Sequence, residues 1–465
     1  MQHRTPQLII VLVLALLTQP LHAREQPKSR ETVWTMTLSP AAEPVPAFKH
    51  RLTYRLSEQV PGNGNPLLQT AISLMSTSPE LSEQFDALWN AEDPAIEDRR
   101  RHVGNYASAL RYLELATKRT TYDPETPLRE LGFEALLPSL STTRKLANIL
   151  DMRLQVEIHD QDIPAAVRSL RTGYTLAKQV GDQHTLVESL VGIGIAALMN
   201  NRTRDLIQLQ SAPNLYWSLA ELRPLIDGRN AIQGEASWFY FSFQGMDLTR
   251  RDEFVADQWR QVLAGVARVF QTTPAADSGE ADPIQLAAMV AASIGPSRQI
   301  LQTSGFTDAQ IERMSPQEIV GRAMLLDYEI AMDDITKAWH LPTPQALAVM
   351  RATEERFAAQ KDRSLLPFAR MLIPSLSRAR LTVARLDRDL AMLMTIEALR
   401  AHAAANAGSL PASFDELTVL PVPPNPYTGQ PFEYRRTDTG CEILCPPAAG
   451  DSTNESLRVV ITLRK

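Results

Sequence analysis

The sequence predicts a mainly α-helical fold, in which stacked antiparallel helical hairpins precede a small C-terminal α+β module of one helix and an antiparallel sheet. Helix start signals recur along most of the chain, and strand-like alternation is found near both ends. Hydrophobic residues make up 44% of the 465 residues, so the chain can bury a large core. The expected segments are a signal peptide (1–23), a proline-rich N-terminal arm (24–66), a helical domain (67–383) and the C-terminal module (384–465).

The first segment has the features of an export signal. Its apolar run Leu8–Leu17 is too short to span a bilayer, and Ala23 is the small residue that signal peptidase requires. We therefore expect cleavage after Ala23 and a periplasmic or secreted protein of the cell envelope. The alternative is an uncleaved membrane anchor through residues 8–19, because the region before Ala23 is imperfect for cleavage. Membrane contact is expected only in that case.

The proline-rich arm contains one strand-like stretch. Trp34, Met36 and Leu38 recur at every second position, which is the period of a half-buried strand. The prolines that follow, from Pro40 to Pro61, forbid a long helix in this segment.

The helical domain carries repeated helix boundaries. Asp162 is an N-cap candidate and Gly181 a C-terminal stop for a helix over Pro164–Val180. The capping box Ser315–Glu318 opens another helix that extends towards Trp339. Two further boundaries are marked by proline: a helix from Asp282-Pro283 to Gly295-Pro296, and the start of the next at Thr343-Pro344.

Three consecutive helices, over Arg144–His159, Pro164–Val180 and Thr185–Asn200, resemble tetratricopeptide-like hairpins. The short turn after His159 and the small residues of the second helix fit this resemblance. A period of about 34 residues does not recur along the chain, so the resemblance covers one or two repeat-like units.

The C-terminal module is expected to contain a helix, a turn and a sheet. A capping box at Ser413 begins a short helix, and Gly429 allows a turn with positive φ. Alternation predicts strands around Tyr434 and over Leu457–Leu463. The helix Ala384–Ala405 would present a stripe of Leu386, Leu390, Leu393 and Ile396 to Phe432, Tyr434, Val459 and Ile461.

This tail resembles the soluble head of type II secretion pseudopilins. The resemblance lies in Ser409-Leu410-Pro411, Asp415-Glu416-Leu417 and Asn425–Arg435, which follow the helix. It implies a helix packed on a small antiparallel sheet and a protein-protein role. In some pseudopilins this region binds calcium, but Asn425 stands where those proteins have an aspartate.

Nearly the full length is similar to an uncharacterised family of long exported proteins that are abundant in planctomycetes. The resemblance implies this architecture and supplies no reaction. The residues that carry it are Ser39–Lys49, Pro61–Asn63, Ala212–Trp217, Arg223–Asp227 and the tail motif.

The charge pattern argues against nucleic acid as a partner. The formal net charge is −6, and no block of Lys and Arg alternates with aromatic residues. The same pattern argues against an anionic membrane surface as the main partner.

Only two cysteines are present, Cys441 and Cys445. If they lie in a strand, they are about 13 Å apart at about 3.3 Å per residue, too far for a disulfide. A turn at this point would allow a local bridge, so the sequence leaves both states open.

No catalytic, cofactor or metal site emerges from the motifs. Gly192-x-Gly194 matches the dinucleotide pattern by letter, but no strand precedes it, and close helix packing explains the glycines better. His184 and Glu188 lie one helical turn apart, yet two ligands do not make a metal site. The carboxylates Asp327, Glu329, Asp333 and Asp334 are expected on a solvated helix face, where Glu329, Asp333 and Lys337 form a ladder.

The densest aromatic cluster is the candidate partner surface. Aromatic side chains bury large areas at interfaces, although a core segment where helices meet is the alternative. The cluster consists of Trp238, Phe239, Tyr240, Phe241 and Phe243, in a chain with 6% aromatic residues.

These observations favour an exported, non-enzymatic helical interaction scaffold of the cell envelope with a protein partner. The alternative is an envelope hydrolase or ligand-binding protein whose site is assembled from residues distant in sequence, which motifs cannot detect. A pocket that brought carboxylates or histidines together would favour this alternative.

Overall fold

The computed structural model describes residues 30–464 except 76–78, 92–93, 132–134, 242, 244–245, 271–282, 360–366, 450 and 452–453. The fold is mainly helical with a small C-terminal helix-and-sheet module, which confirms the expected fold class. The expected export signal lies outside the described residues. No helix among those described is long and apolar enough to cross a membrane.

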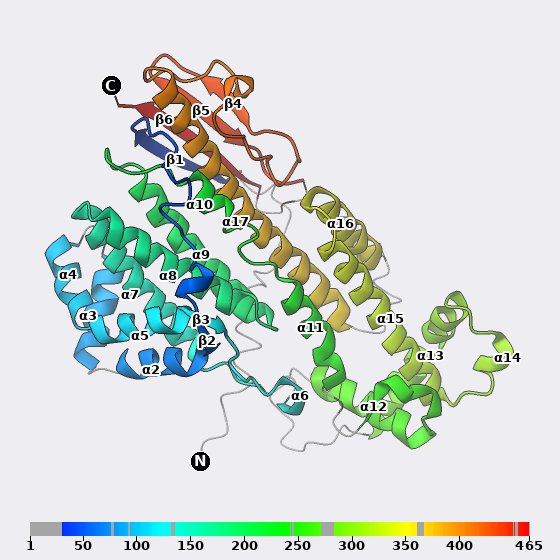
Figure 1. Cartoon of the computed structure of the whole chain (residues 1–465). Helices are drawn as coiled ribbons and strands as arrows, with labels where there is room; N and C mark the ends of the chain where they lie inside the picture. Colours follow the sequence, from blue (N-terminus) through cyan, green and yellow to red (C-terminus); the bar gives the residue numbers. More distant parts are fainter. Residues whose placement is uncertain are drawn as a thin grey trace. The chain divides into compact units, whose positions relative to one another are not determined.

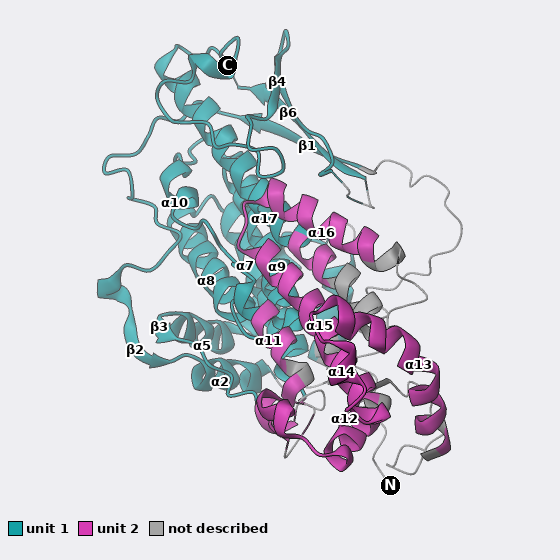
Figure 2. Ribbon diagram, turned by 90° about the vertical axis from the view of Figure 1, so that its right-hand side faces the viewer, with its two compact units in different colours: residues 1–126, 136–231, 381–465 teal, residues 127–135, 232–380 magenta. Residues whose placement is uncertain are grey.

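The chain forms two compact units (Figure 2). Unit 1 comprises Met1–Thr126, Leu136–Ala231 and Leu381–Lys465, and unit 2 comprises Pro127–Ala135 and Ile232–Arg380. Unit 1 therefore draws on the arm, the helical domain and the C-terminal module together.

The sheet of unit 1 has four strands in the order β1-β6-β5-β4. The strands β4 (Glu433–Arg436), β5 (Gly440–Cys445) and β6 (Glu455–Leu463) are antiparallel, as the sequence predicts. The arm adds β1 (Arg30–Leu38) in parallel beside β6, so the sheet is mixed. The apolar alternation of β1 explains this pairing, because Trp34 and Met36 lie opposite Val459 and Ile461 and are buried with them.

The long helix α17 (Pro367–Ala405) lies along this sheet with its unit 1 part (Figure 1). It begins well before the expected Ala384. Arg385 pairs with Asp451 at 2.8 Å and with Glu455 at 3.6 Å, which joins the helix to the start of β6. The expected stripe is buried, namely Leu386, Leu390, Leu393 and Ile396, and so are Phe432, Val459 and Ile461 of the sheet side.

The turn region of the tail differs from one expectation. Ser413 makes no capping hydrogen bond, and η4 (Phe414–Glu416) is a single 3-10 turn. The Glu416 carboxylate instead accepts from the Ala412 backbone N–H at 2.7 Å. The expected reciprocal capping box is therefore wrong, because the carboxylate takes a neighbouring amide.

Asn425 shapes the turn for which the pseudopilin resemblance raises the question of calcium binding. Its side-chain Oδ1 accepts from the Tyr427 N–H at 2.9 Å, and its carbonyl accepts from Gly429 N at 2.8 Å.

Cys441 and Cys445 lie on β5 and are buried free thiols, so the extended-strand alternative is correct. Burial raises the pKa of Cys441 to about 12 and that of Cys445 to about 11, so both are protonated thiols near neutral pH.

The helices of unit 1 include the predicted hairpins. Asp162 caps α8 by accepting from Ala165 N at 3.0 Å, as the sequence predicts. The consecutive hairpin helices are α7 (Ser139–His159), α8 (Ile163–Gly181) and α9 (Leu186–Leu206). The others are α2 (Asn65–Met75), α3 (Pro79–Asn90), α4 (Ile96–Gly104), α5 (Ala107–Thr117), α10 (Tyr216–Ala220) and the 3-10 turn η1 (Leu56–Glu58).

Gly192 allows α8 and α9 to pack closely. A Cβ atom at Gly192 would lie 2.4 Å from the Gly181 Cα and 2.5 Å from the Ala177 carbonyl oxygen. A Cβ at Gly194 would meet nothing within 4 Å. Close packing is thus confirmed for Gly192, while Gly194 faces open space.

Unit 2 contains the remaining helices. Their bounds are α6 (Leu128–Leu131), α11 (Arg229–Phe241, with Arg229–Ala231 assigned to unit 1), η3 (Leu248–Glu253), α12 (Ala256–Phe270), α13 (Pro283–Thr303), α14 (Asp308–Ile311), α15 (Pro316–Trp339) and α16 (Thr343–Ala359). Ser315 caps α15 by accepting from Glu318 N at 3.2 Å. Glu318 does not reach back to complete the box, because its carboxylate binds Arg322 at 2.9 Å.

The helix expected to end at Gly295-Pro296 continues to Thr303 with Pro296 inside it. Ser297 and Leu301, which follow the proline, are fully buried. Leu301 belongs to a core cluster with Ile311 and Ile319. Tertiary packing thus outweighs the local stop signal, because ending the helix at the proline would expose these side chains.

A buried junction fixes the arm to α17. The Arg400 guanidinium donates to the carbonyls of Ser39 at 3.0 Å and Ala212 at 2.8 Å. It also donates to the Pro213 carbonyl at 3.3 Å and pairs with Glu397 at 2.9 Å. The side chains of Arg400 and Glu397 are both 0% exposed. We call these five residues the Arg400 junction.

Candidate ligand-binding groove

A cavity of about 550 Å³ opens on unit 1. Its volume lies within the range of small-ligand sites. We call it the groove. It is lined by Leu52, Thr53, Tyr54, Gln59, Thr117, Arg119, Thr120, Tyr122, Tyr174, Thr175, Lys178, Gln179, Asp182, Gln183, Glu221, Leu222, Pro224 and Leu225.

One wall of the groove is the C-terminal half of α8. The lining positions from Tyr174 to Asp182 span about 12 Å at about 1.5 Å per residue. The strand β3 (Arg119–Thr121), which pairs in parallel with β2 (Val60–Asn63), also contributes lining residues. These two short strands form a separate two-stranded sheet.

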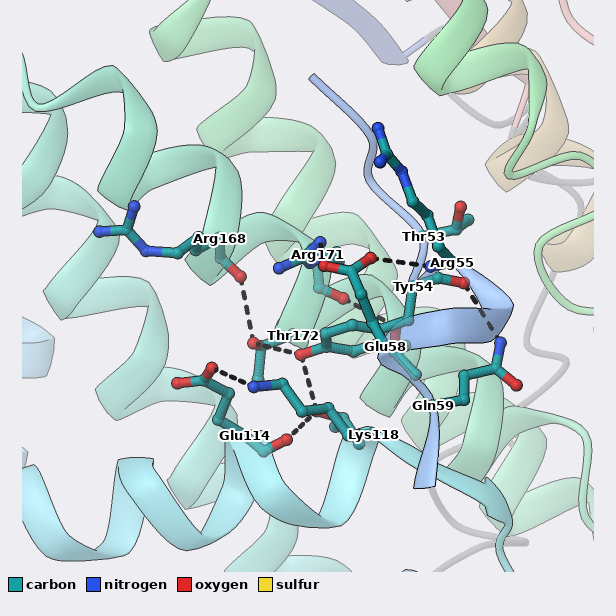
Figure 3. A network of polar contacts seen from close by, with 12 residues as sticks. Thr53, Tyr54, Arg55, Glu58, Gln59, Glu114, Lys118, Arg168, Arg171 and Thr172 are labelled. Atoms are coloured by element: carbon teal, nitrogen blue, oxygen red, sulfur yellow. Dashed lines mark hydrogen bonds and ion pairs between the residues drawn. The ribbon is translucent and has the colours of Figure 1, made fainter. Parts of the chain in front are cut away.

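Tyr54, which lines the groove, anchors the arm through a network of polar contacts (Figure 3). Its hydroxyl makes hydrogen bonds with Thr117 at 3.2 Å and Thr172 at 3.1 Å. Arg171 stacks over the Tyr54 ring at 4.5 Å and pairs with Glu58 at 3.0 Å. The arm is therefore held against α5 and α8 by specific polar contacts, and this wall has a fixed position.

Cations and carboxylates balance in the groove lining. Lys178 pairs with Asp182 at 2.9 Å. Glu221 forms an ion pair with Arg51, and Arg119 donates to the Pro61 carbonyl at 2.9 Å. Two basic and two acidic residues thus line the groove, and the two carboxylates already have cationic partners. The remaining polar lining consists of hydroxyl and amide groups, which suit an uncharged polar ligand.

Gln179 of α8 and Gln183, just after this helix, contact carbonyls between the end of α5 and the residue after β3. The Gln179 Nε2 lies 3.5 Å from the Thr117 carbonyl and 3.5 Å from the Arg119 carbonyl. The Gln183 Nε2 donates to the Tyr122 carbonyl at 3.1 Å. Gln179 thus binds these two carbonyls weakly, at the end of α5 and the start of β3, because strong N–H···O bonds measure about 2.7–3.2 Å.

Glu188 is a buried carboxyl close to this wall. It is 3% exposed, and its Oε2 accepts from the Thr185 hydroxyl at 2.8 Å. Burial raises its pKa from an ordinary 4.5 to about 7; the negative charge of Asp123 adds to this, and the Thr185 hydrogen bonds oppose it. Burial, with the nearby negative charges of Glu188 and Asp123, also raises the pKa of Tyr122 in the groove lining. The phenol is therefore a neutral donor.

The aromatic cluster proposed from the sequence belongs to unit 2, whereas the groove belongs to unit 1. Tyr240 donates to Glu329 at 2.8 Å, and Phe241 lies under Arg129 at 5.7 Å. Phe243 is buried. The side chains of Trp238 and Phe239 lie outside the described part of the structure. The cluster as a partner surface stays a prediction.

The other candidate groups are dispersed. Glu329 binds Arg251 through two contacts of 2.6 and 3.0 Å, so the expected ladder with Asp333 and Lys337 is replaced by a contact with η3. His184 is exposed while Glu188 is buried, so they do not converge. Among the described residues, no group of three or more His, Cys, Asp or Glu is placed to hold a metal ion.

Motif reasoning missed the groove because its residues come from four chain segments. A signal was present in the two segments Ala212–Trp217 and Arg223–Asp227, which the family resemblance singled out. The first forms part of the Arg400 junction, where Asn214 donates to the carbonyls of Ala41 at 3.2 Å and Glu397 at 2.8 Å. The second contributes Pro224 and Leu225 to the groove.

Comparison with known proteins gives no relative: no protein-family model, no curated protein and no solved structure matches this chain.

Proposed function

We propose that this protein is an exported, non-enzymatic binding protein of the cell envelope, and that its groove receives an uncharged, extended segment of a protein partner. The observation that carries the proposal is the groove lining, in which the charged groups balance and the other polar groups are hydroxyls and amides. Export is supported by the sequence of residues 1–23 alone. The resemblance of the tail to pseudopilin heads supports a role in the envelope.

The dimensions of the groove favour a peptide. The lining stretch of α8 is about 12 Å long, which accommodates about four residues of an extended chain at about 3.3 Å per residue. A peptide backbone presents donors and acceptors in alternation, and the lining amides and hydroxyls can serve both. Because Tyr54 holds the arm in place, the part of the groove that the arm lines is preorganised. Preorganisation lowers the entropic cost of binding.

The alternative of a hydrolase receives less support from this geometry. No histidine is among the residues that line the groove, and the lining carboxylates are Asp182 and Glu221. Asp182 pairs with Lys178, while Glu221 pairs with Arg51 and accepts from Thr53 at 2.6 Å. Both lining carboxylates are therefore engaged in ion pairs.

The test is a binding screen with defined peptides. We would screen the purified full-length chain against a library of N-acetylated, C-amidated hexapeptides of uncharged residues by fluorescence polarisation. The best-binding member is the probe peptide for all later measurements. We expect Thr175→Trp, which fills the groove from α8, to weaken probe binding by at least about tenfold.

The matched control is Ala197→Trp, which adds the same side chain at an exposed site of α9 outside the lining. It should leave affinity within about twofold of the original chain. Thermal unfolding of both variants checks that the fold is retained. If no library member binds, or if both tryptophan variants bind equally, the proposed function is wrong.

A further inference from the structure

The strand β1 forms one outer edge of the four-stranded sheet in unit 1 (Figure 2). It is nine residues long, and its sequence Arg30–Leu38 contains no proline or lysine. The other outer strand, β4, is four residues long and carries three charged side chains. Short, charged edge strands resist pairing with another chain, whereas long edges without such protection favour it. β1 is therefore the edge of this sheet that is open to a further strand.

The backbone groups of β1 alternate between its two sides. The Leu38 carbonyl accepts from the Arg464 N–H, just after β6, at 2.8 Å and therefore faces β6. The Thr37 N–H points the other way and donates to the Gln208 side chain at 3.2 Å. Alternate residues of a strand direct their N–H and carbonyl groups to the same side. The residues that share this outward direction are Glu31, Val33 and Thr35, and in the described part of the chain their backbone groups have no hydrogen-bond partner on that side.

We infer that two copies of this protein associate through β1, whose free edges pair antiparallel around a two-fold axis at Val33. The two sheets then form one continuous sheet. In this register Val33 lies opposite Val33 of the second copy, and Glu31 of each copy lies opposite Thr35 of the other. The inference concerns a different surface from the groove and does not depend on the proposed function.

The free edge is complementary to itself. Its three residues with unpartnered backbone groups are evenly spaced around Val33, so a two-fold axis there pairs all of them and leaves none over. Each opposed pair of this kind exchanges two N–H···O bonds. On the side of Thr37 the edge is already closed by Gln208. A second copy thus supplies a partner for each unpaired group, within the length that Gln208 leaves open.

The side chains at this edge also suit a second copy. Val33 is 43% exposed, and Glu31 and Thr35 are exposed beside it on the same face. The axis brings the two valines together, and β-branched side chains favour such cross-strand pairs. Glu31 pairs with Arg458 of its own sheet at 3.0 Å and faces a threonine of the second copy. No like charges are therefore opposed across the axis, which would weaken the pairing.

The paired edges are small. Standard protein interfaces bury about 1,600 Å² in total, and three strand residues from each copy contribute much less. We therefore expect a weak dimer, with a dissociation constant on the order of micromolar. Association should accordingly depend on protein concentration.

The experiment is sedimentation equilibrium of the full-length chain between about 1 and about 100 µM. Val33→Glu should raise the dissociation constant at least about tenfold, because it places two carboxylates against each other across the axis. Within each copy the new carboxylate lies beside Arg458, so folding is not opposed. The matched control is Thr37→Glu, which adds the same charge to an exposed residue outside the paired set. It should stay within about twofold of the original chain.

A mixture of two variants tests the position of the axis. Val33→Lys alone should also associate weakly. Its equimolar mixture with Val33→Glu should form a mixed dimer at least as tight as the original one, because position 33 of each copy faces position 33 of the other. Thermal unfolding of each variant checks that the fold is retained. The inference is overturned if the original chain is monomeric over this range, if Thr37→Glu weakens association as much as Val33→Glu, or if the mixture does not recover association.

Discussion

The Arg400 junction and the groove are both built where the N-terminal arm meets the helices of unit 1, yet they differ in how completely their hydrogen bonds are made. At the junction, one guanidinium reaches three carbonyls and Glu397 within 3.3 Å, with no solvent exposure of either charged side chain. In the groove, Gln179 spans two carbonyls at 3.5 Å beside open space. Unit 1 therefore has one closed polar contact that specifies the docking of the arm and one looser polar contact between α8 and the chain around β3.

The largest effect is expected at the Arg400 junction. Arg400→Met should lower the free energy of unfolding by about 3–5 kcal/mol, because it removes the cationic partner of the buried Glu397 carboxyl. Denaturant unfolding followed by circular dichroism measures this loss.

A double variant separates burial of an unpaired charge from loss of packing. Glu397→Leu combined with Arg400→Met should cost less than Arg400→Met alone. Arg435→Ala, at an exposed strand position, serves as the control and should change stability by less than about 0.5 kcal/mol. If Arg400→Met behaves like Arg435→Ala, the junction does not specify the arm.

The second prediction concerns Glu188, behind the groove wall. Its folded-state pKa of about 7 exceeds the ordinary 4.5, so the unfolded chain releases this proton first as pH rises. The free energy of unfolding should therefore fall by roughly 3 kcal/mol in total as the pH rises from 4.5 to about 7. At higher pH it should stay at this lower level.

Glu188→Gln keeps an oxygen that can accept from Thr185 and has no charge to bury. The difference in unfolding free energy between this variant and the original chain should grow in the variant's favour from about pH 4.5 to pH 7. A difference that is constant with pH would show that Glu188 is not a strained carboxyl at this wall.

A smaller effect is expected on the face of α9 that packs against α8. Gly192→Ala should destabilise the chain by about 1–3 kcal/mol, because the new methyl group would overlap Gly181 and Ala177. The matched variant Gly194→Ala meets nothing and should stabilise the helix by roughly 0.5–1 kcal/mol. Thermal unfolding of the two variants gives shifts of opposite sign if the helix contact is as close as described.

The smallest effect is expected at the contact between Gln179 and the carbonyls of Thr117 and Arg119. Gln179→Ala should change the free energy of unfolding by less than about 1 kcal/mol, since its hydrogen bonds are long and its side chain is half-buried. Denaturant unfolding measures the change. If Gln179→Ala lost as much unfolding free energy as Arg400→Met, the Gln179 contact and the Arg400 junction would not differ in their contribution to stability.

Local signals in the sequence predicted much of the fold, because caps and apolar periods act over a few residues. Asp162 and Ser315 cap the helices that follow them, and the apolar stripe of α17 is buried. Pro296 was misjudged because the packing of distant side chains around Leu301 decides whether its helix continues. Sequence patterns over a few residues carry no information about that packing.

The candidate site could not be predicted for the same reason. Tyr54, Arg119, Gln179 and Glu221 each follow ordinary local rules, and only the tertiary fold brings them around one cavity. The parallel addition of β1 is another nonlocal choice: alternation predicted a strand, but not its neighbour.

The pairing of β1 with β6 sets the order in which unit 1 can form. Arg458 of β6 donates to Glu31 of β1 across a sequence separation of 427 residues. The first strand of the sheet is therefore synthesised long before its partner, and the complete sheet can form only once β6 is available. Its closure brings together segments far apart in sequence, which is an entropically costly and slow kind of step.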